Sequence, residues 1–205
     1  DAHTHLDACG AVDADDVRAI LDRAAAAGVQ AVVTIADDLE SAQWAVAAAD
    51  WDPRVYAAVA LHPTRANALT DEARTVIERL AEHPRVVAIG ETGMDMYWPG
   101  RLEGGADPAE QRDAFAWHID LAKRTGKPLM IHNRDADADV LDVLRAEGAP
   151  ESVIFHCFSS DAEMARTCVA AGWLLSLSGT VSFKNARALR EAAALIPADQ
   201  LLVET

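Results

Sequence analysis

Residues 128–155 read PLMIHNRDADADVLDVLRAEGAPESVIF, and this stretch shows most clearly the unit that repeats along the chain. An apolar run at 128–131 is followed by apolar residues at helical spacing up to Gly148, and then by a second apolar run at 152–155. Two short apolar runs on either side of an amphipathic helix are typical of a βαβ unit with buried, parallel strands. The stretch therefore predicts an α/β protein.

Outward from this unit, the same alternation of apolar runs and helical segments predicts eight strands along the chain. Eight β/α units favour a (β/α)8 TIM-type barrel over an open sheet. The predicted helices end at glycines, namely Gly28, Gly126, Gly148 and Gly172. The strands are expected at His3–His5, Ala31–Ala36, Val55–Leu61, Val86–Gly90, Pro128–Ile131, Ser152–Phe155, Trp173–Leu177 and Leu201–Val203.

We expect residues 1–205 to form a single barrel domain that is incomplete at both ends. Only Asp1 and Ala2 precede the first histidine, and no helix follows the predicted strand at 201–203. An eighth strand without its covering helix would expose apolar surface to water. The natural protein is therefore expected to extend past both ends, with the final helix of the barrel absent from this sequence.

Composition limits the classes of function. The 205 residues are 51% hydrophobic and 25% charged, which suits a soluble globular domain with a sizeable core. With 18 basic and 33 acidic residues the net charge is −15, so local groups rather than a long-range positive field must bind any phosphate. No apolar run approaches the ~20 residues of a membrane span. Three cysteines without a Cys-x-x-Cys pair are expected to be reduced thiols. We predict a cytoplasmic monomer with no membrane partner.

Five of the seven histidines fall at the predicted carboxyl ends of strands, where barrel active sites lie. His3 and His5 are two residues apart on one strand, so their side chains point to the same side. Glu91, His132 and His156 follow three other strands at the same height. Four imidazoles and a carboxylate in one small volume indicate a metal site rather than core packing. Because a carboxylate has two oxygens, Glu91 can bridge two cations, which favours a two-metal site.

Six short motifs occur in order along the chain: DAHTHLD at 1–7, LHP at 61–63, AIGETGMD at 88–95, PLMIHNR at 128–134, HCFS at 156–159 and LLVET at 201–205. This series resembles that of the TatD-like metal-dependent deoxyribonucleases, a branch of the metal-dependent hydrolase barrels, over the whole chain. The resemblance implies that His3 and His5 hold one cation. It also implies that His132 and His156 hold a second cation and that Glu91 bridges the two.

The family places an aspartate ligand directly after the Glu-Thr pair, and this sequence ends at Thr205. That aspartate would complete the ligands of the first cation and accept a proton from the attacking water. Glu204 and Glu91 are the predicted catalytic carboxylates. The implied cofactors are two divalent cations, with Mg²⁺ expected in nuclease activity, although mixed imidazole and carboxylate ligands also accept Zn, Mn, Fe or Ni.

The predicted substrate contacts are a histidine and two cationic side chains at the catalytic face, His62, Arg134 and Lys184. Loops after the last strands of such barrels often bind phosphate, although Lys184 and the nearby candidate Arg65 could equally be solvated loop charges. A further set of aromatic residues could stack on a base or simply pack the loops: Tyr97, Trp98 and Phe158. His83 and His118 are expected to be surface or packing residues.

The leading functional prediction is a deoxyribonuclease that cleaves phosphodiester bonds of DNA ends or short single strands, bound weakly, through a metal-activated water. The alternative is an amidohydrolase-type C–N or ester hydrolase of a small metabolite. Many such enzymes bridge their metals with a carbamylated lysine at the end of the fourth strand, where this chain has Glu91. A barrel that keeps its ligands only as structure is a third class, which intact ligands on four strands argue against.

Overall fold

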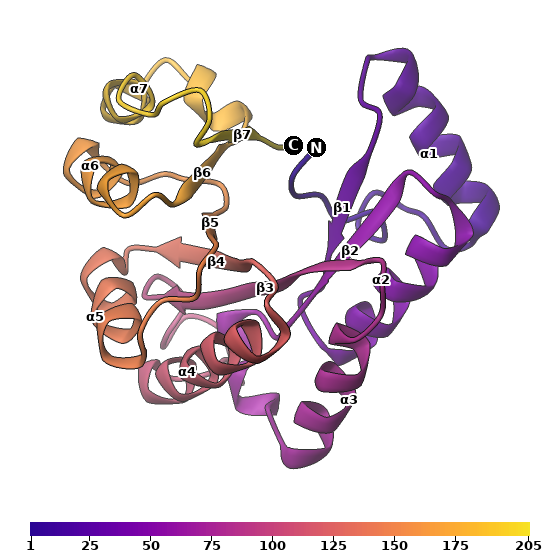
Figure 1. Ribbon diagram of the computed structural model, residues 1–205, viewed down its shortest axis with the longest axis horizontal. Coiled ribbons are helices and arrows are strands. Elements are labelled where there is room, and N and C mark those ends of the chain that lie inside the picture. The colour runs from indigo at the N-terminus through magenta and orange to yellow at the C-terminus, as the bar shows by residue number, and fades with distance from the viewer.

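The computed structural model describes residues 1–205 and has an α/β architecture built on one curled sheet (Figure 1). All neighbouring strands are parallel, and they follow one another in chain order. This order is that of a (β/α) barrel. The seven strands are β1 (Val32–Ile35), β2 (Val55–Val59), β3 (Val86–Asp95), β4 (Leu129–Arg134), β5 (Val153–Phe155), β6 (Leu174–Leu177) and β7 (Leu201–Val203).

Helices connect the strands and lie outside the curled sheet (Figure 1). Aspartate side chains cap the N-termini of the four helices that begin at Ala14, Leu39, Pro108 and Ala162, so part of the acidic charge stabilises helix ends. None of the helices is both long enough and apolar enough to cross a membrane. The elements are α1 (Ala14–Ala26), α2 (Leu39–Trp51), α3 (Asp71–Ala81), α4 (Pro108–Thr125), α5 (Asp137–Glu147), α6 (Ala162–Ala170) and α7 (Arg187–Ala193), with 3₁₀ helices η1 (Pro63–Ala68) and η2 (Gly179–Ser182).

The predicted helix ends are confirmed. Gly28, Gly126, Gly148 and Gly172 each follow a helix and have φ values of 94°, 65°, 74° and 76°. Side chains strain this left-handed backbone, whereas glycine adopts it readily. Each helix therefore stops where the chain must turn back to the sheet.

Seven of the predicted strands are confirmed, and β3 is longer than predicted. The prediction ended this strand at Gly90, but it runs to Asp95 because residues 92–95 pair with 131–134 of β4. Glu91 thus lies inside a strand rather than after it. Gly93 permits the close pairing, since a Cβ there would lie 2.2 Å from the carbonyl oxygen of His132.

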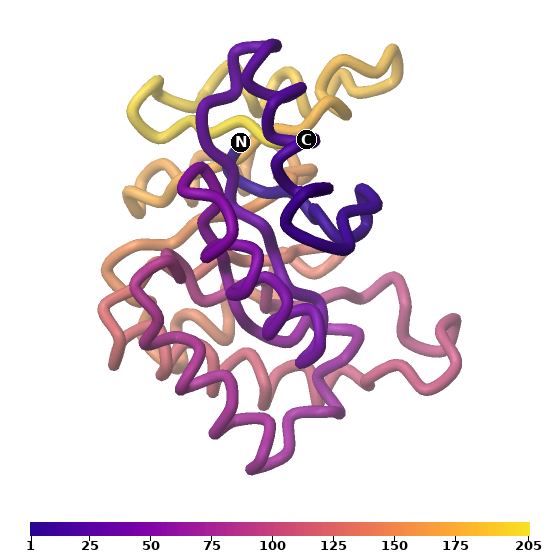
Figure 2. The backbone as a smooth tube through the Cα atoms, turned by 90° about the vertical axis from the view of Figure 1, so that its right-hand side faces the viewer, coloured from indigo at the N-terminus to yellow at the C-terminus, as the bar shows by residue number.

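The prediction of a strand at His3–His5 is wrong. This segment forms a single parallel bridge, between Thr4 and Thr34, because the chain leaves the sheet in a turn that begins at Leu6. The segment nevertheless lies between the two edges of the sheet: the amide of Thr4 donates to the carbonyl of Val33 in β1, and the amide of Ala2 to that of Val203 in β7. Figures 1 and 2 show the two termini near one another. The closed eight-stranded barrel, the single domain and the absent final helix stay predictions.

Two apolar layers meet at the sheet. The outer layer, a cluster of 39 buried residues that includes Phe115 and Phe155, packs the helices against the strands. The inner cluster consists of Ile35, Ala58, Ala88, Met130 and Ile154, one residue from each of β1 to β5. Side chains alternate along a strand, so the residues two positions after Met130 and Ile154 point to the same inner side. These residues are His132 and His156.

His118 on α4 is a packing residue, as predicted, and it is fully buried. Its Nδ1 lies 2.7 Å from the carbonyl oxygen of Ala114 and 3.1 Å from Thr92 Oγ1, while its Nε2 accepts from the amide of Leu61 at 3.3 Å. Both ring nitrogens are therefore used by a neutral imidazole. Burial lowers the pKa of His118 from 6.5 to about 4.

We expect His118 to make the fold less stable in mild acid. Between pH 6.5 and about 4 the unfolded chain binds a proton at His118 that the folded chain does not, so the unfolding free energy falls as pH falls through this window. The full loss is on the order of 3 kcal/mol. Urea unfolding of the unaltered protein and of His118→Gln, each at pH 7.5 and pH 5, measures this loss of unfolding free energy. The loss should be smaller in the variant. Equal losses in the two proteins would show that His118 does not contribute.

Candidate metal centre

The side chain of Glu91 lies at the centre of the candidate site and is only 4% exposed. Its Oε1 lies 3.6 Å from Nε2 of both His3 and His5. Its Oε2 lies 3.1 Å from His132 Nδ1 and 2.6 Å from His156 Nε2. The two oxygens of one carboxylate thus face two different pairs of imidazoles.

The second nitrogen of three of these imidazoles also faces a sulfur or oxygen atom, closely in His3 and His132 and at a longer distance in His156. His3 Nδ1 lies 3.3 Å from Met130 Sδ, and His132 Nε2 lies 3.0 Å from Asp95 Oδ2. His156 Nδ1 lies 3.5 Å from Glu204 Oε1. A carboxylate on the outer nitrogen fixes the orientation of an imidazole and makes its other nitrogen a better metal ligand.

Sequence reasoning gave Asp95 no role. The predicted strand ended at Gly90, so Asp95 lay outside it and only within the motif at 88–95. In the structure Asp95 is fully buried, at the end of β3 in register with Arg134. The signal that could have found it is spacing, since Asp95 follows Glu91 by four residues and an even spacing on one strand places two side chains on one side.

Glu204 reaches the same cluster from just after β7, with a side chain that is 2% exposed. Ligand atoms of His3, His156 and Glu204 lie within 4.8 Å of one another. Glu204 Oε2 and His156 Nδ1 are buried without a hydrogen-bond partner. Because unpaired buried polar atoms cost free energy, this donor set of imidazole nitrogens and carboxylate oxygens fits a bound divalent cation.

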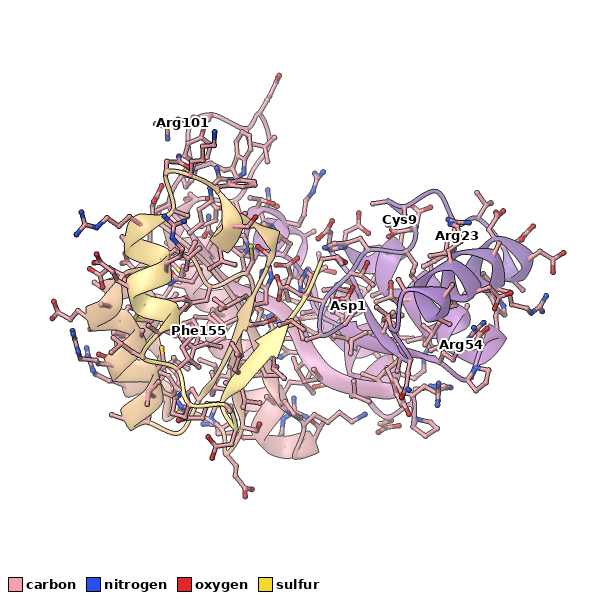
Figure 3. All side chains as sticks on the ribbon, turned by 90° about the horizontal axis from the view of Figure 1, so that it is seen from above. Asp1, Cys9, Arg23, Arg54, Arg101 and Phe155 are labelled. Carbon is pink, nitrogen blue, oxygen red and sulfur yellow. The ribbon has the colours of Figure 1, made fainter.

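The two ends of the chain contact one another beside this cluster. The backbone amide and the hydroxyl of Thr205 donate to the carboxylate of Asp1, and Figure 3 shows Asp1 beside β7.

The cluster holds a buried negative charge. Burial favours the neutral acid of Glu91, but the charge of His156 and hydrogen bonds from His132 and His156 outweigh it and hold the pKa of Glu91 well below its usual range. Burial opposes protonation of His156, yet Glu91 and Glu204 raise its pKa to about 10. Burial, together with the charge of His156, lowers the pKa of His3 to about 2. An ionised carboxylate buried among imidazoles therefore draws positive charge into the site.

His62 lies beside the cluster, at the N-terminus of η1. The amide of Thr64 donates to His62 Nδ1 at 3.1 Å, so the ring proton is on Nε2, which lies 3.3 Å from His132 Nδ1. Burial lowers the pKa of His62 to about 4. His62 is thus a neutral hydrogen-bond donor aimed into the site.

The remaining candidates are placed differently. Arg134, at the end of β4, lines a pocket of about 240 Å³ that His132 and His156 also line. Lys184 is exposed between η2 and α7, and its side chain has no hydrogen bond or ion pair with any site residue. Arg65 lines a separate pocket next to His62. Phe158 is 2% exposed and packs in the core. Of the three aromatic candidates for base stacking, only Tyr97 and Trp98, in the loop after β3, therefore remain.

A curled parallel sheet with an imidazole and carboxylate cluster at the carboxyl ends of its strands is the architecture of the metal-dependent hydrolase barrels. Over residues 1–205 the sequence matches the family described as TatD related DNase. The chain belongs to this family, and it is a metal-dependent hydrolase.

Related proteins agree with this assignment. The "uncharacterized metal-dependent hydrolase TatD" of Mycobacterium tuberculosis is 78% identical over the whole chain, which spans 78% of that protein. The "3'-5' ssDNA/RNA exonuclease TatD" of Cronobacter turicensis is 35% identical over 91% of this chain and 70% of its own length. The crystal structure of a TatD homologue from Escherichia coli superposes with a TM-score of 0.83 at 28% identity, covering 93% of this chain and 73% of that one.

Proposed function

We propose that this protein is a divalent-metal-dependent deoxyribonuclease that cleaves phosphodiester bonds at DNA ends or in short single strands. The observation that carries the proposal is the division of the Glu91 carboxylate between two imidazole pairs. Relatives from Cronobacter turicensis and Musicola paradisiaca named as single-stranded DNA and RNA exonucleases support the choice of substrate.

The proposed ligands follow the two sides of Glu91. His3 and His5 would hold one cation beside Oε1, and His132 and His156 would hold the second beside Oε2. Mg²⁺ is the expected ion in function, although the imidazole-rich donor set also suits Zn, Mn, Fe or Ni. Bound there, two divalent cations would lower the pKa of a water and offset charge on a phosphoryl oxygen.

The surrounding side chains have separate roles in the proposal. Glu204 stays a predicted catalytic carboxylate: its Oε1 lies 3.5 Å from His156 Nδ1, where it would orient the imidazole, and its Oε2 has no hydrogen-bond partner. His62 would donate from Nε2 to a phosphate oxygen, and Arg134 would bind a phosphate of the substrate from the adjoining pocket. Lys184, on the loop after β6, stays a predicted substrate contact. The cytoplasmic location and the monomeric state also stay predictions.

Binding of DNA should be weak and only shallowly dependent on salt, since a chain of net charge −15 offers few cations to displace counterions from phosphates. The decisive comparison is hydrolysis of an end-labelled single-stranded oligonucleotide and of a cyclic amide, each with Mg²⁺ or Mn²⁺ and with excess chelator. We expect cleavage of the oligonucleotide alone, abolished by the chelator. Hydrolysis of the amide without cleavage of the oligonucleotide would replace the proposal by the small-metabolite alternative.

A further inference from the structure

Two arginines lie against the ring of Tyr97 in the loop after β3. The Cζ atom of Arg134 is 4.0 Å from the ring centroid, and that of Arg101 is 4.8 Å from it. Contacts of this length between a guanidinium and an aromatic ring are attractive. Neither arginine forms an ion pair with a carboxylate, although the chain has 33 acidic residues. We call Tyr97, Arg101 and Arg134 the Tyr97 rim.

The backbone that carries the Tyr97 ring is fixed from beneath. Asp95 Oδ1 accepts from the amides of Tyr97 at 2.9 Å and Trp98 at 3.0 Å. The buried side chain of Gln111 donates to the carbonyls of Asp95 and Ala106, at the two ends of the loop, and accepts from the amide of Asp95. The other oxygen of Asp95 lies against His132, so the rim and the metal centre share one anchoring residue.

The two guanidinium groups extend from the site outwards. Arg134 lines the pocket that His132 and His156 share, whereas Arg101 is an exposed residue of the loop. Figure 3 shows this loop, with Arg101 labelled, projecting from the body of the molecule, and Figure 2 shows the same projection from another side. The rim therefore offers positive charge both in the pocket next to the metal centre and beyond it.

The contacts of the Tyr97 ring argue against the base-stacking role considered for it from the sequence. Its neighbours are guanidinium groups, which bind phosphate oxygens through planar donor pairs. We propose that the Tyr97 rim binds phosphate groups of the substrate chain that flank the bond being cleaved. This inference rests on the proposed nuclease function and deepens it by naming the side chains that would bind phosphates other than the one being cleaved, which small phosphodiesters with a single phosphate lack.

Tyr97→Leu tests the rim because leucine fills space but offers no aromatic face. The probes are a single-stranded oligonucleotide of about ten nucleotides and bis(p-nitrophenyl) phosphate, which has no flanking phosphate. Loss of two exposed cation–π contacts should raise the KM for the oligonucleotide about 5- to 10-fold and change the KM for the small ester less than about 2-fold. Tyr97→Phe keeps the ring and should restore the preference.

Binding of the labelled oligonucleotide in excess chelator gives a readout that needs neither metal nor turnover. Tyr97→Leu should weaken this binding by the same factor. Arg101→Gln changes an exposed side chain outside the core, and it should weaken binding and reduce the salt slope by about 1. Arg145→Gln, an exposed arginine on α5, is the charge-matched control.

The outcomes separate the two proposals. If the unaltered protein cleaves neither phosphodiester, the proposed function is wrong, while binding in chelator still tests the rim. If the unaltered protein cleaves both substrates, and Tyr97→Leu keeps the preference and the affinity for the oligonucleotide, the proposed role of the Tyr97 rim is wrong. The nuclease proposal then stands. Equal losses on both substrates would also overturn the rim, because they would indicate a general effect on the metal centre.

Discussion

Glu91→Gln is expected to lower kcat/KM on a phosphodiester by about a thousandfold or more. Each Glu91 oxygen faces its own pair of imidazoles, His3 and His5 on one side and His132 and His156 on the other. A glutamine keeps the shape but replaces one oxygen by an NH₂ group that cannot ligate a cation, and it removes the negative charge. A thousandfold loss corresponds to about 4 kcal/mol of transition-state stabilisation, a magnitude consistent with losing a shared metal ligand.

The same substitution should reduce bound metal at both positions, which elemental analysis of the purified protein measures. Glu147→Gln, which alters an exposed carboxylate at the end of α5, is the matched control and should retain metal and activity. Thermal unfolding of both variants separates a loss of metal from a loss of fold. Full metal content together with full activity in Glu91→Gln would disprove the bridging role.

Asp95→Asn is expected to weaken cation binding at the His132 side of the site about 10- to 100-fold. An asparagine can still accept from the amides of Tyr97 and Trp98, as Asp95 Oδ1 does. It can also place an NH₂ group opposite His132 Nε2, where the carboxylate oxygen now lies at 3.0 Å. The imidazole would then lose the acceptor that orients it, and its metal-facing Nδ1 would become less basic.

Competition with a chromophoric chelator measures the cation affinity of Asp95→Asn. Asp135→Asn is the matched control, because Asp135 is exposed and asparagine tolerates its positive φ of 54°. We expect the affinity for one of the two cations to fall in Asp95→Asn and both affinities to be unchanged in the control. Two unchanged affinities in Asp95→Asn would mean that His132 is oriented by its packing alone.

Most of the sheet was predictable because parallel strands buried on both faces are apolar throughout, as the run at 153–155 is. The failures have local causes. Residues 91–95 contain polar residues and a glycine, so they read as a loop, and only pairing with β4 makes them a strand. The side chains of His3 and His5 do lie beside Glu91, yet their segment forms one bridge because the chain turns at Leu6.

The candidate site was predictable to the extent that it follows strand ends. His132 and His156 each lie at or just beyond the end of an apolar run, so their convergence follows from the barrel pattern. Asp95 was missed together with the extension of β3. The contacts of Arg101 and Arg134 with Tyr97 depend on the conformation of a loop whose sequence has no periodic pattern, so no sequence signal predicted them.

Two cation positions share the carboxylate of Glu91 in the proposed metal centre. Anomalous diffraction from crystals grown with Mn²⁺ tests this sharing most directly, because it places each ion relative to named atoms. We expect two peaks, one beside Glu91 Oε1 with His3 and His5 and one beside Oε2 with His132 and His156. A single peak, or two peaks that do not both contact Glu91, would contradict this sharing.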